Sequence, residues 1–282
     1  MAFIIVPTDF SESAYNALFY ATQLFPNEDC NITLVHSFES QFSTSTSRID
    51  IARNEKLYDT LEINVNKQFE KIKHKIIRDN ERVNRNIETV SSAQPLCKIV
   101  NHLIVNTTAD FVVMGTKGAS GLQEVFIGSK AVSLIKKIKP IPIFLIPQNS
   151  VFQKPTSIAY ATDLKVDYAQ YPLEIIKEII RSHKSKLHIS HIYNQVSPEN
   201  TVEYNFRKLK LKLEDVDYST HWISSKKAMR DALAEFCEEH NINLLVLMYH
   251  KYGFLKGLLK TSFVEKVSFK SQIPLLILPD SF

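Results

Sequence analysis

The amino-acid sequence contains the same succession of short apolar segments twice. The segment from Ile4 to Asp9 ends in a Thr-Asp pair, and the segment from Ile158 to Asp163 ends in the same pair. An apolar run bounded by proline also closes each copy, from Ile141 to Pro147 and from Ile273 to Pro279. Self-similarity over such a distance is typical of a duplicated structural unit. The chain is therefore interpreted as one fold written twice.

Each copy alternates short apolar runs with amphipathic stretches. The runs 32–36 and 112–114 of the first copy correspond to 187–191 and 246–248 of the second. Short runs of this kind are typical of strands that are buried on both faces. Between the strands, apolar residues recur at helical spacing. In the first copy these residues are Ala14, Ala17, Leu18 and Ala21, and then Leu61, Val65, Phe69, Ile72 and Ile76.

The alternation of strands and helices predicts the fold class. Parallel neighbouring strands need a crossover connection, and a helix is its usual form. We predict an α/β protein of two tandem domains, each a mostly parallel five-stranded open sheet of Rossmann-like type with helices on both faces. The length of 282 residues agrees with two domains, because domains commonly run about 100 to 150 residues. The predicted domains are residues 1–149 and 153–282.

The charge balance argues against a nucleic-acid-binding protein. The 34 basic and 30 acidic side chains are interspersed and leave a net charge of +4, whereas nucleic-acid binding usually needs a concentrated basic face. The most basic stretch, Lys67 to Arg85, also contains Glu70, Asp79 and Glu81 on a helical pattern. This mixture is typical of a solvated helix face. We expect no nucleic-acid partner.

Cysteine usage and the apolar start of the chain bear on its location. Cys30, Cys97 and Cys237 are odd in number and far apart, which fits neither a disulfide framework nor a metal or redox motif. The apolar start from Phe3 to Val6 is too short for a signal peptide or a membrane span and predicts a buried strand. We expect a cytoplasmic protein with no membrane partner.

Glycine occurs at only six positions, although average usage of about 7% would give roughly twenty. All six lie where two corresponding strands end: Gly115, Gly118, Gly121 and Gly128 in the first copy, and Gly253 and Gly257 in the second. Such placement indicates a need for positive φ, or for an approach so close that a Cβ would block a ligand. In an open α/β sheet, ligands bind at these carboxyl ends of the strands.

The spacing of the first glycine loop is Gly115-x2-Gly118-x9-Gly128-Ser129, between a strand and a helix that carries Val132, Leu134, Ile135 and Ile138. The start of that helix offers unpaired N–H groups and a positive dipole end to an anion. The loop matches neither the Walker A pattern nor the dinucleotide GxGxxG pattern. The sequence therefore excludes those two families and leaves a different anion-binding loop.

This spacing, together with Pro7-Thr8-Asp9 at the end of the first strand, resembles the ATP-binding type of the universal stress protein family. The whole chain resembles the tandem form of that family. The resemblance implies ATP, with or without Mg²⁺, or AMP or ADP, as the ligand of the first copy. It also implies pairing through the last strand of each copy, either within the chain or in a homodimer.

The resemblance implies contacts to the three parts of a nucleotide. The positions implied on the adenine side are Pro7, Thr8, Asp9 and Val35. Those on the ribose side are Met114 and Gly115. Those around the phosphates are Gly118, Gly128, Ser129 and Lys130, and Lys117 could add a charge-assisted contact.

Simpler structural explanations exist for single residues of this set. Asp9 alone could accept hydrogen bonds from N–H groups at the start of the following helix, and Ser129 could be a helix N-cap. Lys117 could face water, as loop lysines usually do. These alternatives stay open at the level of sequence.

The second copy has lost the glycine pattern. Tyr249, Lys260 and Thr261 stand where the first copy has Gly115, Gly128 and Ser129, and the loop is shorter. A tyrosine side chain at the first of these positions would occupy space that a ribose needs. We therefore expect one nucleotide per chain, bound by the first copy.

Catalysis has little support in the sequence. His188 and His191 are three apart on a predicted strand, so they point to opposite faces and cannot share a metal ion. Hydrolysis of ATP needs a positioned water, a divalent ion and usually a base, and Glu124 is the only carboxylate within the glycine loop. The preferred hypothesis is an ATP-binding regulatory protein of the stress response with an unknown protein partner. The alternatives are a slow Mg²⁺-dependent ATPase and a nucleotide-free scaffold.

Overall fold

The computed structural model divides the chain into two compact units. Unit 1 comprises Met1–Gln23, Asn27–Leu122 and Gly128–Gln148, and unit 2 comprises Leu24–Pro26, Gln123–Ile127 and Asn149–Phe282. The structure describes residues 2–25, 30–45, 51–80, 86–116, 128–164, 168, 173–193, 200–224, 229–248 and 273–279. Each unit is considered by itself.

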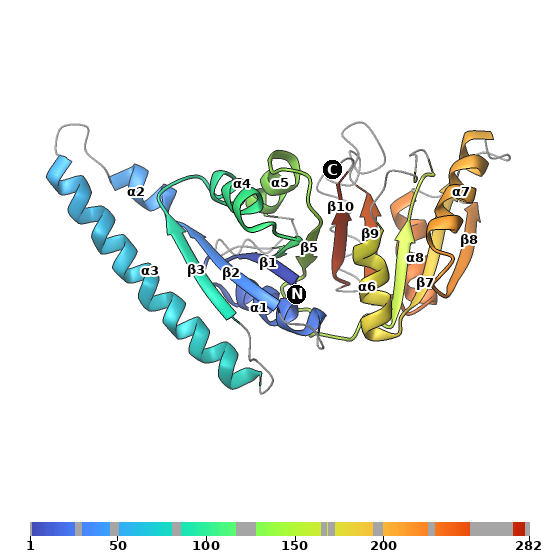
Figure 1. The fold of residues 1–282 in the computed structure, drawn as a ribbon, viewed down its shortest axis with the longest axis horizontal. Helices are drawn as coiled ribbons and strands as arrows, with labels where there is room; N and C mark the ends of the chain where they lie inside the picture. The colour runs from blue at the N-terminus through green and yellow to red at the C-terminus, as the bar shows by residue number, and fades with distance from the viewer. Residues whose placement is uncertain are drawn as a thin grey trace. The chain divides into compact units, whose positions relative to one another are not determined.

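Unit 1 is an open parallel sheet between two layers of helices (Figure 1). Its strands lie in the order β3-β2-β1-β4-β5, and all neighbours are parallel. Helices α4 and α5 cover one face, and α1 and α3 cover the other. The elements are β1 (Ala2–Pro7), α1 (Glu12–Leu24), β2 (Cys30–Ser37), α2 (Glu39–Ser45), α3 (Ile51–Asp79), β3 (Asn86–Ser92), α4 (Leu96–Thr107), β4 (Phe111–Gly115), α5 (Ser129–Lys137) and β5 (Ile143–Ile146).

The core of unit 1 follows the apolar pattern of the sequence. Strands β4 and β5 are buried along their whole length, as expected of strands covered on both faces. Helix α1 buries the predicted stripe of Ala14, Ala17, Leu18 and Ala21. Helix α3 is 29 residues long, and its C-terminal half buries Val65, Phe69, Ile72 and Ile76.

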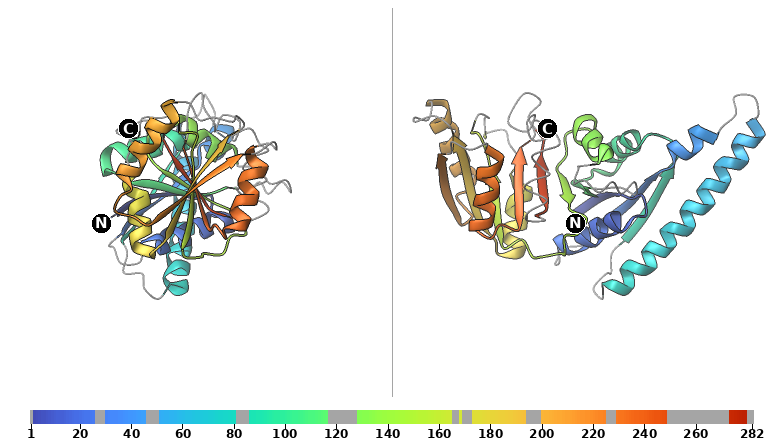
Figure 2. Two further views of the ribbon diagram at one scale, coloured as in Figure 1. Left: turned by 90° about the vertical axis from the view of Figure 1, so that its right-hand side faces the viewer. Right: turned by 180° about the vertical axis from the view of Figure 1, so that it is seen from behind.

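Unit 2 repeats this architecture, seen from behind in Figure 2. Its strands lie in the order β10-β9-β6-β7-β8, again with only parallel pairs. The described elements are β6 (Ser157–Ala161), α6 (Glu174–His183), β7 (Lys186–Tyr193), α7 (Asn200–Lys212), β8 (Tyr218–Ser224), α8 (Met229–Glu239), β9 (Leu244–Met248) and β10 (Leu275–Leu278). The predicted fold of two five-stranded parallel α/β units is confirmed.

The duplication extends to individual hydrogen bonds at the end of the first strand of each unit. Thr8 N donates to Val35 O (2.8 Å), and the Thr8 carbonyl is 2.8 Å from His36 Nδ1. In unit 2, Thr162 N donates to Ser190 O (3.0 Å), and the Thr162 carbonyl is 3.0 Å from His191 Nδ1. The two copies therefore share the backbone geometry of this edge, and not only their strand order.

Among the described residues, no helix combines sufficient length with sufficient apolar character to cross a bilayer.

A histidine cluster occupies one end of the unit 2 sheet. His188 Nδ1 lies 3.1 Å from His221 Nε2, and Ser219 Oγ lies 3.1 and 3.0 Å from these two nitrogens. The His240 ring packs on both imidazoles, with centroid distances of 5.1 and 4.6 Å. Burial, the two neighbouring imidazoles and Lys186 lower the pKa of His188 to about 4. Within the described part of the chain, no set of His, Cys, Asp and Glu residues is suited to hold a metal ion.

This cluster predicts that unit 2 loses stability in mild acid. The pKa of His188 is lowered in the folded state. The contribution of neutral His188 to the free energy of unfolding is therefore complete at pH values above its unfolded-state pKa of about 6.5. It is then lost as the pH falls from about 6.5 towards 4, because the unfolded chain binds the proton first. His221 has a pKa lowered by burial first and then by His240 and Lys186, with Glu239 opposing, so it adds to the same trend. The expected loss is on the order of 2 kcal/mol.

The measurement is urea unfolding at a series of pH values, followed by the fluorescence of Trp222. This residue is the single tryptophan of the sequence and lies on β8, so it reports on unit 2. His188→Gln should flatten the pH dependence between pH 6.5 and 4, whereas the matched control His74→Gln, on the exposed side of α3, should not. An unchanged slope in His188→Gln would contradict the prediction.

Candidate functional site

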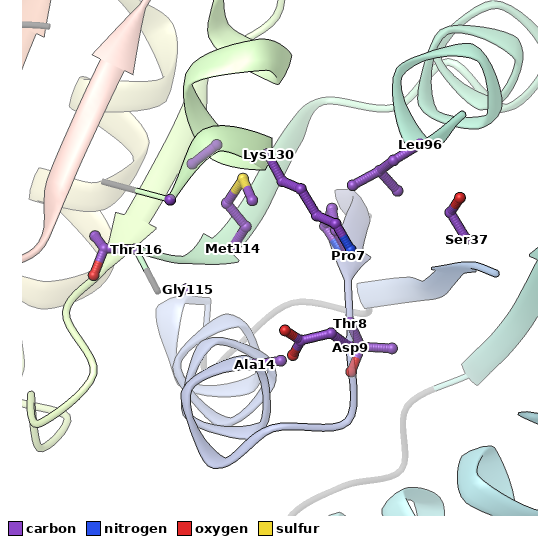
Figure 3. A pocket seen from close by; sticks show the side chains of 12 residues that line it. Pro7, Thr8, Asp9, Ala14, Ser37, Leu96, Met114, Gly115, Thr116 and Lys130 are labelled. Atoms are coloured by element: carbon purple, nitrogen blue, oxygen red, sulfur yellow. The ribbon is translucent and has the colours of Figure 1, made fainter. Parts of the chain in front are cut away.

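A pocket opens in unit 1 at the carboxyl ends of β1 and β4 (Figure 3). These two strands are neighbours at the point where the strand order reverses, which is where open α/β sheets bind their ligands. About 470 Å³ of space lies within the pocket and its mouth, part of it open to solvent. Its lining residues are Pro7, Thr8, Asp9, Ala14, Ser37, Leu96, Met114, Gly115, Thr116, Gly128, Lys130 and Ala131.

The loop after β1 is fixed by its own side chains. Ser11 Oγ accepts a hydrogen bond from Ala14 N (3.2 Å) and donates one to Asp9 Oδ1 (2.6 Å). Ser11 N also donates to Asp9 Oδ1 (3.1 Å). The structural alternative for Asp9, a hydrogen bond from an N–H group at the start of α1, is therefore present for this oxygen. Asp9 also lines the pocket, and Figure 3 shows its carboxylate beside Ala14.

Phe10 makes the turn between the pocket and the helix. Its φ of 65° lies in the left-handed region, which is uncommon for a bulky residue. Thr8 Oγ1 accepts a hydrogen bond from Phe10 N (3.0 Å), and the Phe10 ring packs against His36 (4.5 Å) and Phe69 (5.4 Å). These contacts stabilise the strained backbone and join the loop to β2 and α3.

Gly115, at the end of β4, is required by packing inside the protein. A Cβ at this position would lie 2.5 Å from Ser13 Oγ and 2.9 Å from the Ser13 carbonyl oxygen. The close approach that glycine permits here is thus between β4 and the start of α1. This contact sets the distance between the two elements that form the floor of the pocket.

The start of α5 forms the opposite wall. Gly128 is the N-cap with φ −54° and ψ 145°, a conformation open to any residue, and makes no side-chain cap hydrogen bond. Gly128 N donates to Thr116 O (2.6 Å), which ties the helix start to the end of β4. Ser129 is the first helical residue and is exposed, so it is not the N-cap. The Lys130 side chain extends across the pocket towards Pro7 (Figure 3).

The N-terminus of α4 also reaches the pocket, at Leu96. Its N-cap, Pro95, offers no side-chain cap hydrogen bond, and Ser37 Oγ donates to the Gln94 carbonyl just before it (2.6 Å). Two helix N-termini, those of α4 and α5, thus lie at one pocket together with a lysine. Each N-terminus carries unpaired N–H groups and a partial positive charge. The arrangement is suited to an anion.

The charges near the pocket wall also suit an anionic ligand. His36 is buried behind the β1 loop, and burial lowers the pKa of its imidazole. Its bond to the Thr8 backbone and the charge of Asp9 oppose that lowering, whereas the positive charge of Lys130 adds to it. Burial therefore disfavours the charged imidazole, and Lys130 is the cation that faces the described part of the pocket.

The structure brings together seven of the predicted site residues: Pro7, Thr8, Asp9, Met114, Gly115, Gly128 and Lys130. Val35 does not line the pocket. It is fully buried, and its carbonyl oxygen accepts the Thr8 N–H. Ser129 does not line it either. Lys117 and Gly118 lie outside the described residues, as do Tyr249, Lys260 and Thr261 of the second loop.

Five lining residues were missed by the sequence prediction: Ala14, Ser37, Leu96, Thr116 and Ala131. Strand periodicity could have indicated Ser37. This residue is the last of β2 and lies on the same face of the strand as the predicted Val35, because the two are two residues apart. No sequence pattern indicated Leu96. It is the first residue of α4, and it reaches the pocket only because of the way in which that helix packs across the sheet.

These features define a class of protein. An open parallel sheet with a pocket beside its strand-order reversal, and with helix N-termini at that pocket, is a doubly wound α/β ligand-binding domain. The universal stress protein family model matches the chain twice, at residues 3–146 and 156–279. The chain therefore belongs to the universal stress protein family, in a tandem form. A search of curated protein sequences gives no match.

Solved structures share the fold over the whole chain at low identity. A universal stress protein from Archaeoglobus fulgidus is 18% identical with a TM-score of 0.67, over 98% of this chain and 96% of that one. The cytoplasmic domain of a prokaryotic cation chloride cotransporter is 8% identical with a TM-score of 0.59, over 99% and 95%. Such likeness concerns the fold alone, which carries different functions.

The contact between Gly115 and Ser13 gives a stability prediction. Gly115→Ala should destabilise the protein by about 1–3 kcal/mol, because the new methyl group overpacks the junction of β4 and α1. The matched control Gly128→Ala should cost less, since its backbone conformation suits any residue. Urea unfolding followed by circular dichroism measures both. Equal costs for the two variants would show that the junction yields to a Cβ.

A second-site change sharpens this experiment. Ser13→Ala removes the hydroxyl oxygen at 2.5 Å but leaves the carbonyl oxygen at 2.9 Å. Combined with Gly115→Ala, it should restore part of the lost stability, and a complete restoration would place the whole conflict on the hydroxyl.

Proposed function

We propose that this chain is a regulatory protein that binds one adenine nucleotide, ATP in the first instance, in the pocket of unit 1. The observation that carries the proposal is the convergence of the β1 loop, the end of β4 and the start of α5 on one pocket. These are the three segments whose motifs resemble the ATP-binding members of the family to which the chain belongs.

The adenine is assigned to the side of the pocket near Pro7, and the ribose to the side near Met114 and Gly115. Apolar surface from Pro7, Ala14 and Leu96 suits the faces of a purine ring. Asp9 and Thr8 supply oxygen atoms at the same side, and such atoms pair with the exocyclic amino group of adenine.

The phosphates are assigned to the side formed by α5. Backbone N–H groups at the start of this helix, with the positive end of its dipole, favour a negative charge. Lys130 lines the same pocket, and its side chain would turn from Pro7 towards these phosphates to make a charge-assisted contact. Mg²⁺ would accompany the phosphates and bind through their oxygens.

Regulation is favoured over catalysis by what lines the described part of the pocket. Asp9 is the only carboxylate there, and one of its oxygens already accepts two hydrogen bonds from Ser11. Rapid phosphoryl transfer needs a positioned water and a metal-binding set besides. Nucleotide occupancy therefore acts on the surface around the pocket, where a protein partner would respond to it.

Lys130 provides the test of the phosphate assignment. In calorimetric titrations, Lys130→Gln should weaken ATP binding about tenfold, equivalent to about 1.4 kcal/mol, because one charge-assisted contact is lost. Adenosine, which has no phosphate, should bind equally to both proteins. Lys136→Gln, in the last turn of the same helix, is the matched control and should bind ATP as the unmodified chain does.

The outcomes separate the rival functions. Absence of ATP binding would reject the proposal and leave the nucleotide-free scaffold. Equal weakening by the two lysine variants would reject the assignment of Lys130. Phosphate release from bound ATP with Mg²⁺, faster than from free ATP, would instead establish the slow ATPase.

A further inference from the structure

We propose that the histidine cluster of unit 2 is a pH-sensitive switch. The cluster holds the C-terminal turn of α8 against strands β7 and β8 while its imidazoles share one proton between them, and it releases this turn when both facing nitrogens are protonated. The release is local, so that the rest of unit 2 stays folded around it. The switch concerns unit 2 alone and is independent of nucleotide binding by unit 1.

The end of α8 rests on two of the histidines. Phe236, in the last turn of α8, meets the His221 ring edge-on at a centroid distance of 4.9 Å and the His188 ring at 6.3 Å. His240 follows α8 directly, and its ring lies 4.4 Å from the Phe236 ring and 4.6 Å from the His221 ring. The imidazoles of β7 and β8 are therefore the surface on which this turn of the helix packs.

The bond between His188 and His221 depends on the number of protons that the pair carries. His188 Nδ1 and His221 Nε2 lie 3.1 Å apart, so one nitrogen must donate a proton and the other must accept it. One charged and one neutral ring keep this bond. Two charged rings place an N–H group on each nitrogen and bring two positive charges together. Ser219 Oγ lies within 3.1 Å of both nitrogens, but a neutral hydroxyl group does not compensate the repulsion between two cations.

The charged groups around the pair decide how many protons it tolerates. Burial, the other two imidazoles and Lys186 of β7 all disfavour a charge on His188 and lower its pKa to about 4. Glu239 of α8 opposes this effect at His221, and the negative end of the α8 dipole also favours a cation here. A single carboxylate balances a single charge. The first added proton is therefore tolerated, and the second separates the rings as the pH falls towards 4.

Cys237 is a natural reporter of this turn. It follows Phe236 in α8 and is a buried free thiol. Burial raises its pKa to about 12, so the thiol is unreactive while α8 packs on the sheet. Release of the turn exposes it.

Trp222 reports on the opposite face of β8. Its ring packs on Phe206 of α7 (5.3 Å) and on His191 of β7 (5.0 Å), away from α8. Its fluorescence therefore shows whether β8 and α7 stay in place when Cys237 becomes accessible.

The experiment measures the rate at which dithiodipyridine, which still reacts with thiols in acid, labels Cys237 in the full chain between pH 7 and 4.5. Cys30→Ala and Cys97→Ser leave this cysteine as the single thiol, and each rate is divided by that of the urea-unfolded chain at the same pH. Acidification should accelerate labelling about thirtyfold without loss of the folded Trp222 signal. Low urea concentrations should change the rate little, because a local opening exposes little surface.

Variants assign the acceleration to the facing nitrogens. His188→Gln places an uncharged amide beside His221 and should abolish the acceleration. His221→Gln should have the same effect, and it replaces His188→Gln if that variant does not fold. Two matched controls should retain the acceleration: His74→Gln, on the exposed side of α3, and Ser219→Ala, which keeps both imidazoles.

The contrary outcomes are equally specific. An unchanged rate in the parent chain, or an equal acceleration in His188→Gln, would overturn the switch. Labelling that appears only together with loss of the Trp222 signal, and with the urea dependence of global unfolding, would mean that acid unfolds unit 2 as a whole. Loss of the acceleration in Ser219→Ala would assign the response to the hydroxyl group and contradict the role of the two nitrogens.

Discussion

The reversal of strand order between β1 and β4 is the constraint on which the site of unit 1 depends. Because right-handed crossovers must leave these strands in opposite directions, α1 and α3 lie on one face of the sheet and α4 and α5 on the other. The loops after β1 and β4 therefore separate, and a pocket opens between them. Its floor is closed by the contact of Gly115 with Ser13, which a larger residue could not make. The position of the pocket therefore follows from the topology of the sheet.

Much of the fold followed from the sequence because buried parallel strands have a strong apolar signal. Strands β1, β4 and β5 could be placed from apolar runs alone, and the same was true of β9 and β10. Strand β3 could not be located, since it lies at the sheet edge and none of its side chains is fully buried. Helix α2 was also missed, because all of its residues are at least partly exposed and leave no apolar stripe.

The site was predictable to the extent that it consists of strand ends. Thr8, Asp9, Met114 and Gly115 stand at the ends of apolar runs, and the family resemblance implied them as site residues; all four line the pocket. The glycine argument predicted positive φ or the close approach of a ligand at Gly115, and the structure adds a distinction, because a Cβ there would strike Ser13. That distinction depends on the distance between β4 and α1, which no sequence pattern contains. Val35 was predicted from the family resemblance, yet its side chain faces the core.

The open pocket of unit 1 bears on the stability of that unit. A pocket with apolar walls lacks packing partners on one side, and unfilled apolar volume costs stability in proportion to its size. Ala14, Leu96 and Met114 contribute apolar surface to this pocket. A ligand that binds only the folded state stabilises it according to its concentration. Under the proposed assignment, the stability of unit 1 therefore follows the level of free nucleotide.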